Sequence, residues 1–192
     1  MKDFAGKIAV ITGGGTGMGR ELARQLVAEG CNVAMCDVSA EAMAETKKLC
    51  EAERLPQGLR VTTHIADVSI EDHLKRFRDE LIEQQATDKI HLLFNNAGIF
   101  TKAGTIDEIS VEDWKRSVDT NLTGAFLCAR AAFAAMRAQD PQGGRIINNG
   151  SISAHVPRPG SAPYTSTKHA LTGLTRTISL DGRPFNIACG QI

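Results

Sequence analysis

The fold is decided by Ile8-Ala9-Val10-Ile11-Thr12-Gly13-Gly14-Gly15-Thr16-Gly17-Met18-Gly19, an apolar run that leads directly into a glycine-rich turn. The run is typical of a buried strand, and the helical spacing of the apolar residues after it predicts a helix that ends near Gly30. Glycines let the backbone turn sharply and approach a ligand, and the start of a helix favours negative charge. The layout predicts a phosphate-binding turn. The spacing G-x-x-x-G-x-G differs from G-x-G-x-x-G, and a plain tight turn is the alternative.

A second apolar run, Asn32-Val33-Ala34-Met35-Cys36, ends at Asp37. A carboxylate ~20 residues beyond the glycines can hydrogen-bond the adenosine ribose of a dinucleotide. The same charge repels the 2′-phosphate of NADP, and no Arg or Lys lies between Gly13 and Gly19 to offset it. The sequence therefore favours NAD as the cofactor, and Arg20 is the nearest cation that could accommodate NADP instead.

The composition is that of a globular protein: 192 residues, 42% apolar and 23% charged. Its 22 basic and 22 acidic residues balance, which argues against nucleic acid or an anionic membrane as a partner. No apolar run approaches the ~18 residues of a membrane span, and Met1-Lys2-Asp3-Phe4 does not begin a signal peptide. The five cysteines are scattered and contain no C-x-x-C pair, so we expect free thiols, no metal site and a cytoplasmic location.

Strand-like and helix-like segments alternate without a break in composition, which predicts a single domain over residues 1–192. Strands are expected at residues 8–11, 32–36, 60–65, 90–94, 145–149 and 185–189. Right-handed crossovers would join them into a Rossmann-like, doubly wound parallel sheet with helices on both faces. Ligands of such sheets bind beyond the carboxyl ends of the strands, where we find Gly13, Asp37, Asp67, Asn95 and Ser151.

Helix boundaries are marked by short local signals. Ser69-Ile70-Glu71-Asp72 and Ser110-Val111-Glu112-Asp113 both read as capping boxes, and the second opens a long helix that should end before Pro141. Another helix is expected over residues 39–53, broken by Pro56-Gln57-Gly58, and the last one over residues 164–179.

A second group of polar residues consists of Ser151 and the segment Tyr164-Thr165-Ser166-Thr167-Lys168. A helix places Tyr164 and Lys168 one turn apart on the same face. A free phenol has a pKa of ~10, and a lysine cation nearby lowers such a value toward the range of a general base. Ser151 can donate a hydrogen bond to an oxygen that develops charge. An ordinary surface pair of Tyr and Lys is the alternative.

Together these motifs resemble the short-chain dehydrogenase/reductase family, over essentially the whole chain. The residues that carry the resemblance are Thr12-Gly13, Gly17, Gly19, Asp67-Val68, Asn95-Asn96-Ala97-Gly98, Asn121, Ser151, Tyr164 and Lys168. The resemblance implies hydride transfer between a secondary alcohol or ketone and a nicotinamide, with Tyr164 moving the proton and Ser151 holding the same oxygen. It implies that Lys168 lowers the pKa of the tyrosine and binds the nicotinamide ribose. Asn121, inside the long helix, would hold a water that links Lys168 to solvent.

The expected site residues follow from these arguments. The catalytic ones are Asn121, Ser151, Tyr164 and Lys168. The cofactor-binding ones are Gly13, Thr16, Gly17, Met18, Gly19, Asp37, Asp67, Val68, Asn95, Ala97, Gly98, Tyr164 and Lys168. The alternative is a catalytically weak or inactive dinucleotide-binding regulator or scaffold of the same fold.

The resemblance also implies a homodimer or homotetramer that acts on a small-molecule alcohol or carbonyl substrate. Its helices from Ser110 and Tyr164 would pack across one interface. Apolar residues beyond the needs of one core face support this, namely Trp114, Phe126, Phe133 and Met136. The family normally continues well past Ile192 with a segment that covers the substrate, so we expect the functional protein to be longer.

Overall fold

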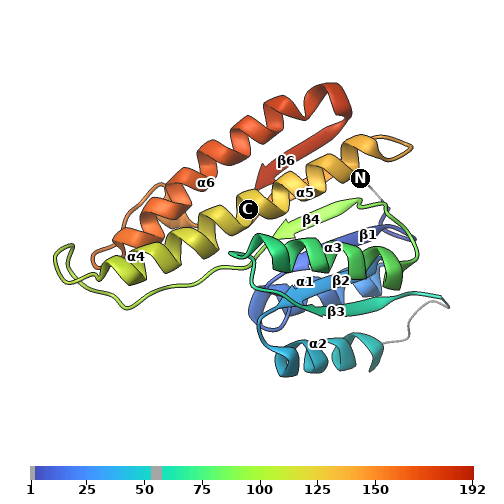
Figure 1. Cartoon of the computed structure of the whole chain (residues 1–192), viewed down its shortest axis with the longest axis horizontal. Helices are drawn as coiled ribbons and strands as arrows, with labels where there is room; N and C mark the ends of the chain where they lie inside the picture. The colour runs from blue at the N-terminus through green and yellow to red at the C-terminus, as the bar shows by residue number, and fades with distance from the viewer. Residues whose placement is uncertain (1–2, 53–57) are drawn as a thin grey trace.

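The computed structural model describes residues 3–52 and 58–192, and it contains one six-stranded sheet with the strand order β3-β2-β1-β4-β5-β6 (Figure 1). The strands are β1 (Ile8–Thr12), β2 (Asn32–Asp37), β3 (Val61–Ile65), β4 (Leu92–Asn95), β5 (Gly144–Asn148) and β6 (Ile187–Gln191). All neighbouring pairs are parallel. The strand order reverses between β1 and β4, where the loops diverge and leave a crevice. The predicted doubly wound, single-domain fold is confirmed.

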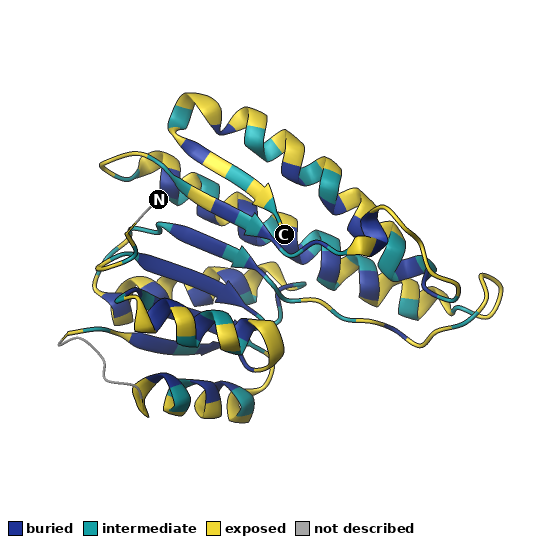
Figure 2. Ribbon diagram, turned by 180° about the vertical axis from the view of Figure 1, so that it is seen from behind, coloured by how far each residue is buried: buried dark blue, intermediate teal, exposed yellow. Residues whose placement is uncertain are grey.

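Helices cover both faces of this sheet. Helices α1 (Gly17–Ala28) and α2 (Ala40–Ala52) pack on one face, and α3 (Glu71–Gln85), α5 (Ala125–Ala138) and α6 (Ala162–Asp181) pack on the other. The central strands are apolar on both sides because both sides are buried, as Figure 2 shows. Strand β6 lies at the edge of the sheet, and its Ala188 and Gly190 are exposed.

The long helix expected from Ser110 is interrupted. It consists of α4 (Val111–Val118), a π-helical turn η1 (Asp119–Gly124) and α5. Its predicted cap forms, since Ser110 Oγ accepts a hydrogen bond from the Asp113 N–H at 3.0 Å. The wider π turn brings Asn121 inward, where it is only 2% exposed. A helix of uniform α pitch was therefore the wrong prediction for this segment.

Other boundaries differ by a few residues. The capping box expected at Ser69 does not form, because Ser69 Oγ donates to Asp67 Oδ1 at 2.6 Å and α3 has no side-chain cap. The last strand begins at Ile187, because Arg183–Phe185 forms a 3-10 turn, η3, before it. Glu53, Pro56 and Gln57, expected at the end of α2, lie outside the described residues.

Two kinds of feature are absent from the part of the chain that the structure describes, residues 3–52 and 58–192. No helix there is long and apolar enough to span a membrane. No group of three or more His, Cys, Asp or Glu side chains there could hold a metal ion. The five cysteines, all within this part, form no disulfide, and burial raises the pKa of the Cys128 thiol to about 12.

Candidate active site

The glycine-rich turn after β1 is fixed by the loop after β4. Thr12 Oγ1 accepts hydrogen bonds from the N–H groups of Asn96 and Ala97, at 3.1 and 3.0 Å. Asn96 Nδ2 donates to the carbonyls of Thr12 and Gly13, at 3.2 and 3.0 Å. A Cβ at Gly19 would lie 2.0 Å from the Gly13 carbonyl oxygen, so only glycine allows α1 to start this close to the turn.

Asp37 lies beside the same turn, at the end of β2. Its Oδ2 accepts a hydrogen bond from the Gly15 N–H at 3.0 Å, and its Oδ1 accepts one from the Ser39 N–H at 3.1 Å. Arg20 donates from Nε and Nη2 to the Gly15 carbonyl, at 3.2 and 2.8 Å. The nearest cation in the sequence is therefore engaged in holding the turn, while the Asp37 carboxylate lines the cleft.

A cleft of about 750 Å³ runs along the carboxyl ends of the strands. Most of the predicted cofactor residues line it: Gly13, Thr16, Gly17, Met18, Asp37, Asp67, Val68, Ala97, Gly98, Tyr164 and Lys168. Among the residues that our sequence-based list lacked are Asn96, Phe100, Arg116, Asp119 and Asn149. Asn149 follows β5, so its place beyond a strand end could have identified it.

Tyr164 and Lys168 face this cleft from the start of α6. The Lys168 Nζ lies 5.4 Å from the centre of the Tyr164 ring and donates to the Asn149 carbonyl at 2.7 Å. Lys168 is 4% exposed, and burial lowers its pKa to about 8. The Phe100 ring, 5.2 Å from the Tyr164 ring between centres, flanks the tyrosine. A phenol and a buried ammonium group thus lie together at one end of the cleft.

A protein-family model described as short chain dehydrogenase matches residues 7–192 of this chain, which include both ends of the cleft. The chain belongs to the short-chain dehydrogenase family. The family resemblance that the sequence motifs indicated is confirmed. The assignment of the chain to the oxidoreductases is confirmed with it.

Members of the family that resemble this chain include a dehydrogenase of a ring alcohol. The chain is 34% identical over 191 residues to trans-4-hydroxycyclohexanecarboxylate dehydrogenase of Sinomonas cyclohexanicum, covering 98% of this chain and 71% of the relative. A short-chain dehydrogenase/reductase from Burkholderia phymatum in complex with NAD matches with a TM-score of 0.89 and 32% identity, over 100% of this chain and 66% of that one. A gluconate 5-dehydrogenase from Burkholderia cenocepacia J2315 in complex with NADP and tartrate matches with a TM-score of 0.87 and 30% identity, over 98% and 71%. Both coenzymes therefore occur on this fold.

Some residues that the family motifs single out lie away from the cleft. Asn95 is 4% exposed, and its Nδ2 donates to the Ala125 carbonyl and to Asn148 Oδ1, at 3.0 and 2.8 Å. It joins β4 to β5 and α5 in the interior and does not line the cleft. Gly19 contributes by its lack of a side chain, behind the turn.

Asn121 and Ser151 form hydrogen bonds with nearby backbone groups. Asn121 Oδ1 accepts from the Ile99 N–H at 2.7 Å, and its Nδ2 donates to the Ile99 carbonyl at 2.9 Å. Asn121 therefore holds the loop after β4, and the water link to Lys168 stays a prediction. Ser151 Oγ accepts from the Ser153 N–H at 3.1 Å, which leaves its own O–H free to donate.

Proposed function

We propose that this protein is an NAD-dependent oxidoreductase that transfers a hydride between a secondary alcohol, or its ketone, and a nicotinamide. The observation that carries the proposal is the pairing of Tyr164 with buried Lys168 at one end of a cleft. The other end holds a glycine turn and the Asp37 carboxylate. A general acid or base and a dinucleotide cradle are the two parts that such a reaction needs.

The residues fit a dinucleotide coenzyme. The Gly13–Gly19 contact leaves no room for a side chain, so the backbone at the helix start is bare and can approach a pyrophosphate. Asp37 ends the neighbouring strand, where a carboxylate can accept hydrogen bonds from ribose hydroxyls. When bound, the coenzyme accepts or supplies the hydride at the nicotinamide ring.

Side chains of the protein transfer the proton in this proposal. Tyr164 takes the hydroxyl proton of an alcohol, or returns it to a ketone, at the phenolic oxygen. The Lys168 ammonium group lies beside the Tyr164 ring, and its hydrogen bond to the Asn149 carbonyl holds it there. Ser151 has a free O–H with which to bind the same substrate oxygen.

A screen of secondary alcohols with NAD, followed by NADH absorbance, tests this function. The screen starts with ring alcohols, because one relative at 34% identity is named for such a substrate. Turnover of at least one alcohol is expected. Tight NAD binding without turnover of any of them would favour the regulator or scaffold, although such a protein has no need to retain Ser151, Tyr164 and Lys168 together.

Asp37→Ala is expected to weaken NAD binding about tenfold, because hydrogen bonds from ribose hydroxyls to a charged group are lost. NADP binding should improve, because the repulsion of its 2′-phosphate is removed with the carboxylate. Calorimetric titration of both coenzymes measures the two affinities. Asp37→Asn is the matched variant, since it removes the charge and keeps hydrogen-bonding atoms. An unchanged ratio of NAD to NADP affinity in both variants would show that Asp37 does not contact the ribose.

We also propose that the protein is a homodimer or homotetramer. Phe126 and Leu180 are 46% and 56% exposed beside a groove between α5 and α6, and Trp114 on α4 is 40% exposed. Met136, which the sequence suggested for this face, is fully buried in the core instead. Light scattering should give a mass at least twice that of the denatured subunit at micromolar concentration. Phe126→Asp should give the monomer, whereas Ile106→Asp, at an exposed apolar residue outside this groove, should not.

We further propose a reducing compartment, the cytoplasm, as the site of action. The five cysteines form no disulfide, and four of them are buried. Oxidising compartments favour paired cysteines in proteins that are exported.

A further inference from the structure

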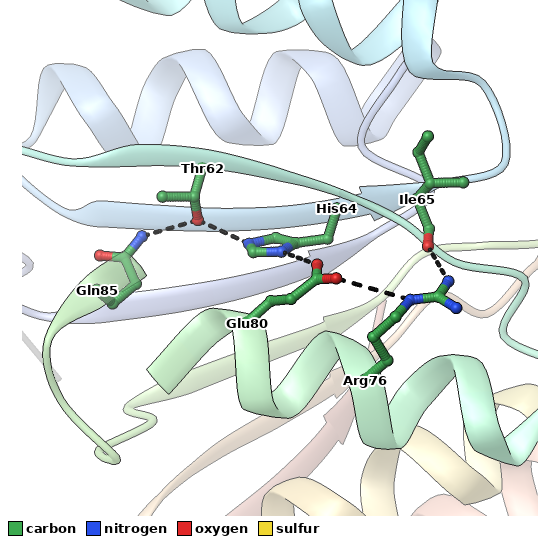
Figure 3. A network of polar contacts seen from close by, with 6 residues as sticks. All are labelled: Thr62, His64, Ile65, Arg76, Glu80 and Gln85. Carbon is green, nitrogen blue, oxygen red and sulfur yellow. Dashed lines mark hydrogen bonds and ion pairs between the residues drawn. The ribbon is translucent and has the colours of Figure 1, made fainter. Parts of the chain in front are cut away.

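A polar cluster outside the cleft surrounds His64, a buried residue of the edge strand β3 (Figure 3). His64 Nδ1 lies 2.9 Å from Glu80 Oε2 on α3, and its Nε2 lies 3.0 Å from Thr62 Oγ1. Gln85, at the end of α3, donates from Nε2 to Thr62 Oγ1 at 3.1 Å. Buried polar groups of this kind impose one geometry on the elements that they join.

The donors and acceptors of the cluster fix the state of the imidazole. The Gln85 amide nitrogen also donates to the Val33 carbonyl at 3.2 Å, and this carbonyl can only accept, so the amide orientation is settled. Thr62 Oγ1 accepts from Gln85 and can give its one hydrogen to His64 Nε2, which suits a neutral imidazole. The proton of the ring is then on Nδ1 and points at the Glu80 carboxylate. Burial lowers the pKa of His64, which agrees with a neutral ring.

The cluster continues toward the turn that follows β3. Arg76 Nε lies 3.6 Å from the second carboxylate oxygen of Glu80, and Arg76 Nη2 donates to the Ile65 carbonyl at 2.9 Å. One turn earlier on α3, His73 Nδ1 accepts from the Asp67 N–H at 3.2 Å. Helix α3 therefore holds the chain at the side chain of residue 64, the carbonyl of residue 65 and the amide of residue 67.

The segment held in this way enters the cleft directly. Asp67 and Val68 follow β3 and line the cleft. They lie in the same half of the sheet as Asp37, which is the last residue of the neighbouring strand β2. In doubly wound sheets the adenosine half of a dinucleotide lies over these strands, and the nicotinamide half lies over the opposite half of the sheet. Tyr164 and Lys168 belong to that opposite half, on the helix between β5 and β6.

We propose that His64, Arg76 and Glu80 are positioning residues for the coenzyme: they fix the turn after β3, so that Asp67 and Val68 keep their places beside the adenosine half. This inference rests on the proposed function, because it takes the cleft as a dinucleotide site. None of the three residues lines the cleft. Arg76 holds the Ile65 carbonyl, and His73 on the same helix holds the Asp67 amide, so they act through the backbone at the start of the turn. Their removal should therefore change coenzyme binding more than the chemical step.

Glu80→Ala tests the inference, since Glu80 touches both His64 and Arg76. The dissociation constants of NAD and of ADP-ribose should rise together by about tenfold, the effect of losing a charge-assisted hydrogen bond. The KM for NAD should rise with them, while kcat at saturating NAD changes less than about twofold. Glu80→Gln keeps an acceptor for the His64 N–H and should recover most of the affinity. Asp72→Ala, which breaks the exposed pair with Lys75 on the same helix, is the matched control and should change neither constant.

Amide hydrogen exchange gives a second measurement that needs no coenzyme. Exchange at Asp67 should accelerate in Glu80→Ala and stay slow in Asp72→Ala, because only the first variant frees the turn. Unchanged exchange at Asp67, or unchanged affinity for ADP-ribose together with a lowered Tm, would overturn the inference and make the cluster merely structural. If the wild-type protein binds neither NAD nor NADP, the proposed function fails instead, and the exchange rates alone decide whether the cluster fixes the turn.

Discussion

Tyr164→Phe is expected to lower kcat by about 10²–10⁴-fold, while the dissociation constant for NAD changes no more than a few-fold. The substitution removes the oxygen that carries the proton and keeps the ring that packs beside Phe100. Steady-state rates with an alcohol found in the screen give kcat, and displacement of fluorescent NADH by NAD gives the NAD affinity.

Ser166→Ala is the control for this experiment. It removes a hydroxyl from the same turn of α6, at an exposed position that does not line the cleft, and should leave kcat unchanged. Retention of half the wild-type rate by Tyr164→Phe would show that another group moves the proton.

Lys168→Met is expected to abolish most activity and to make the protein more stable at neutral pH. The folded protein holds this lysine at a pKa of about 8, against its usual 10.5, because burial disfavours the charge. Between these two pH values the unfolded chain keeps a proton that the folded chain has lost, so the free energy of unfolding rises with pH in that window. Below pH 8 the burial of the charged lysine destabilises the folded protein by about 3 kcal/mol, and a methionine has no charge to bury.

The gain should be smaller than that penalty. The substitution also removes the bond from Nζ to the Asn149 carbonyl, which is worth about 1–2 kcal/mol. We therefore expect Lys168→Met to raise the free energy of unfolding by about 1–2 kcal/mol at pH 7, with kcat reduced at least about 10²-fold.

Urea unfolding at several pH values measures this difference. The advantage of Lys168→Met should shrink as the pH rises from 8 toward 10, because the folded wild-type protein then loses the lysine proton that the unfolded chain still keeps. Lys115→Met, at an exposed position on α4, should show no such pH dependence. If Lys168→Met is less stable than wild type at pH 7, the interactions of the Lys168 ammonium group outweigh the free-energy cost of burying its charge.

Most of the architecture was predictable because its signals are local. The apolar run before the glycines, the acid at the end of the next run, and the alternation of strand and helix patterns were enough for the sheet and its ligand edge. The cap at Ser110 was predictable for the same reason, since donor and acceptor lie three residues apart.

The errors came from contacts between segments that are distant in sequence or from competition among neighbours. Ser69 had two partners within reach, the N–H donors at the helix start and the Asp67 carboxylate, and its hydroxyl donates to the carboxylate. Asn95 lies at a strand end, as several residues that line the cleft do. Its amide turns inward because Asn148 on the neighbouring strand and the Ala125 carbonyl offer partners there. No spacing rule within one segment contains that information.

The π-helical turn η1 also limits where this chain can change in length. A π turn carries one more residue than an α-helical turn, so the register of α5 relative to α4 depends on that residue. Deleting a residue between Val118 and Ala125 would restore an α-helical path. It would rotate either Asn121 away from Ile99 or α5 away from the sheet, by about 100°. Alignment gaps should therefore fall in the loops before Ser110 or after Ala138, and a natural one-residue deletion inside the turn should be accompanied by loss of the asparagine.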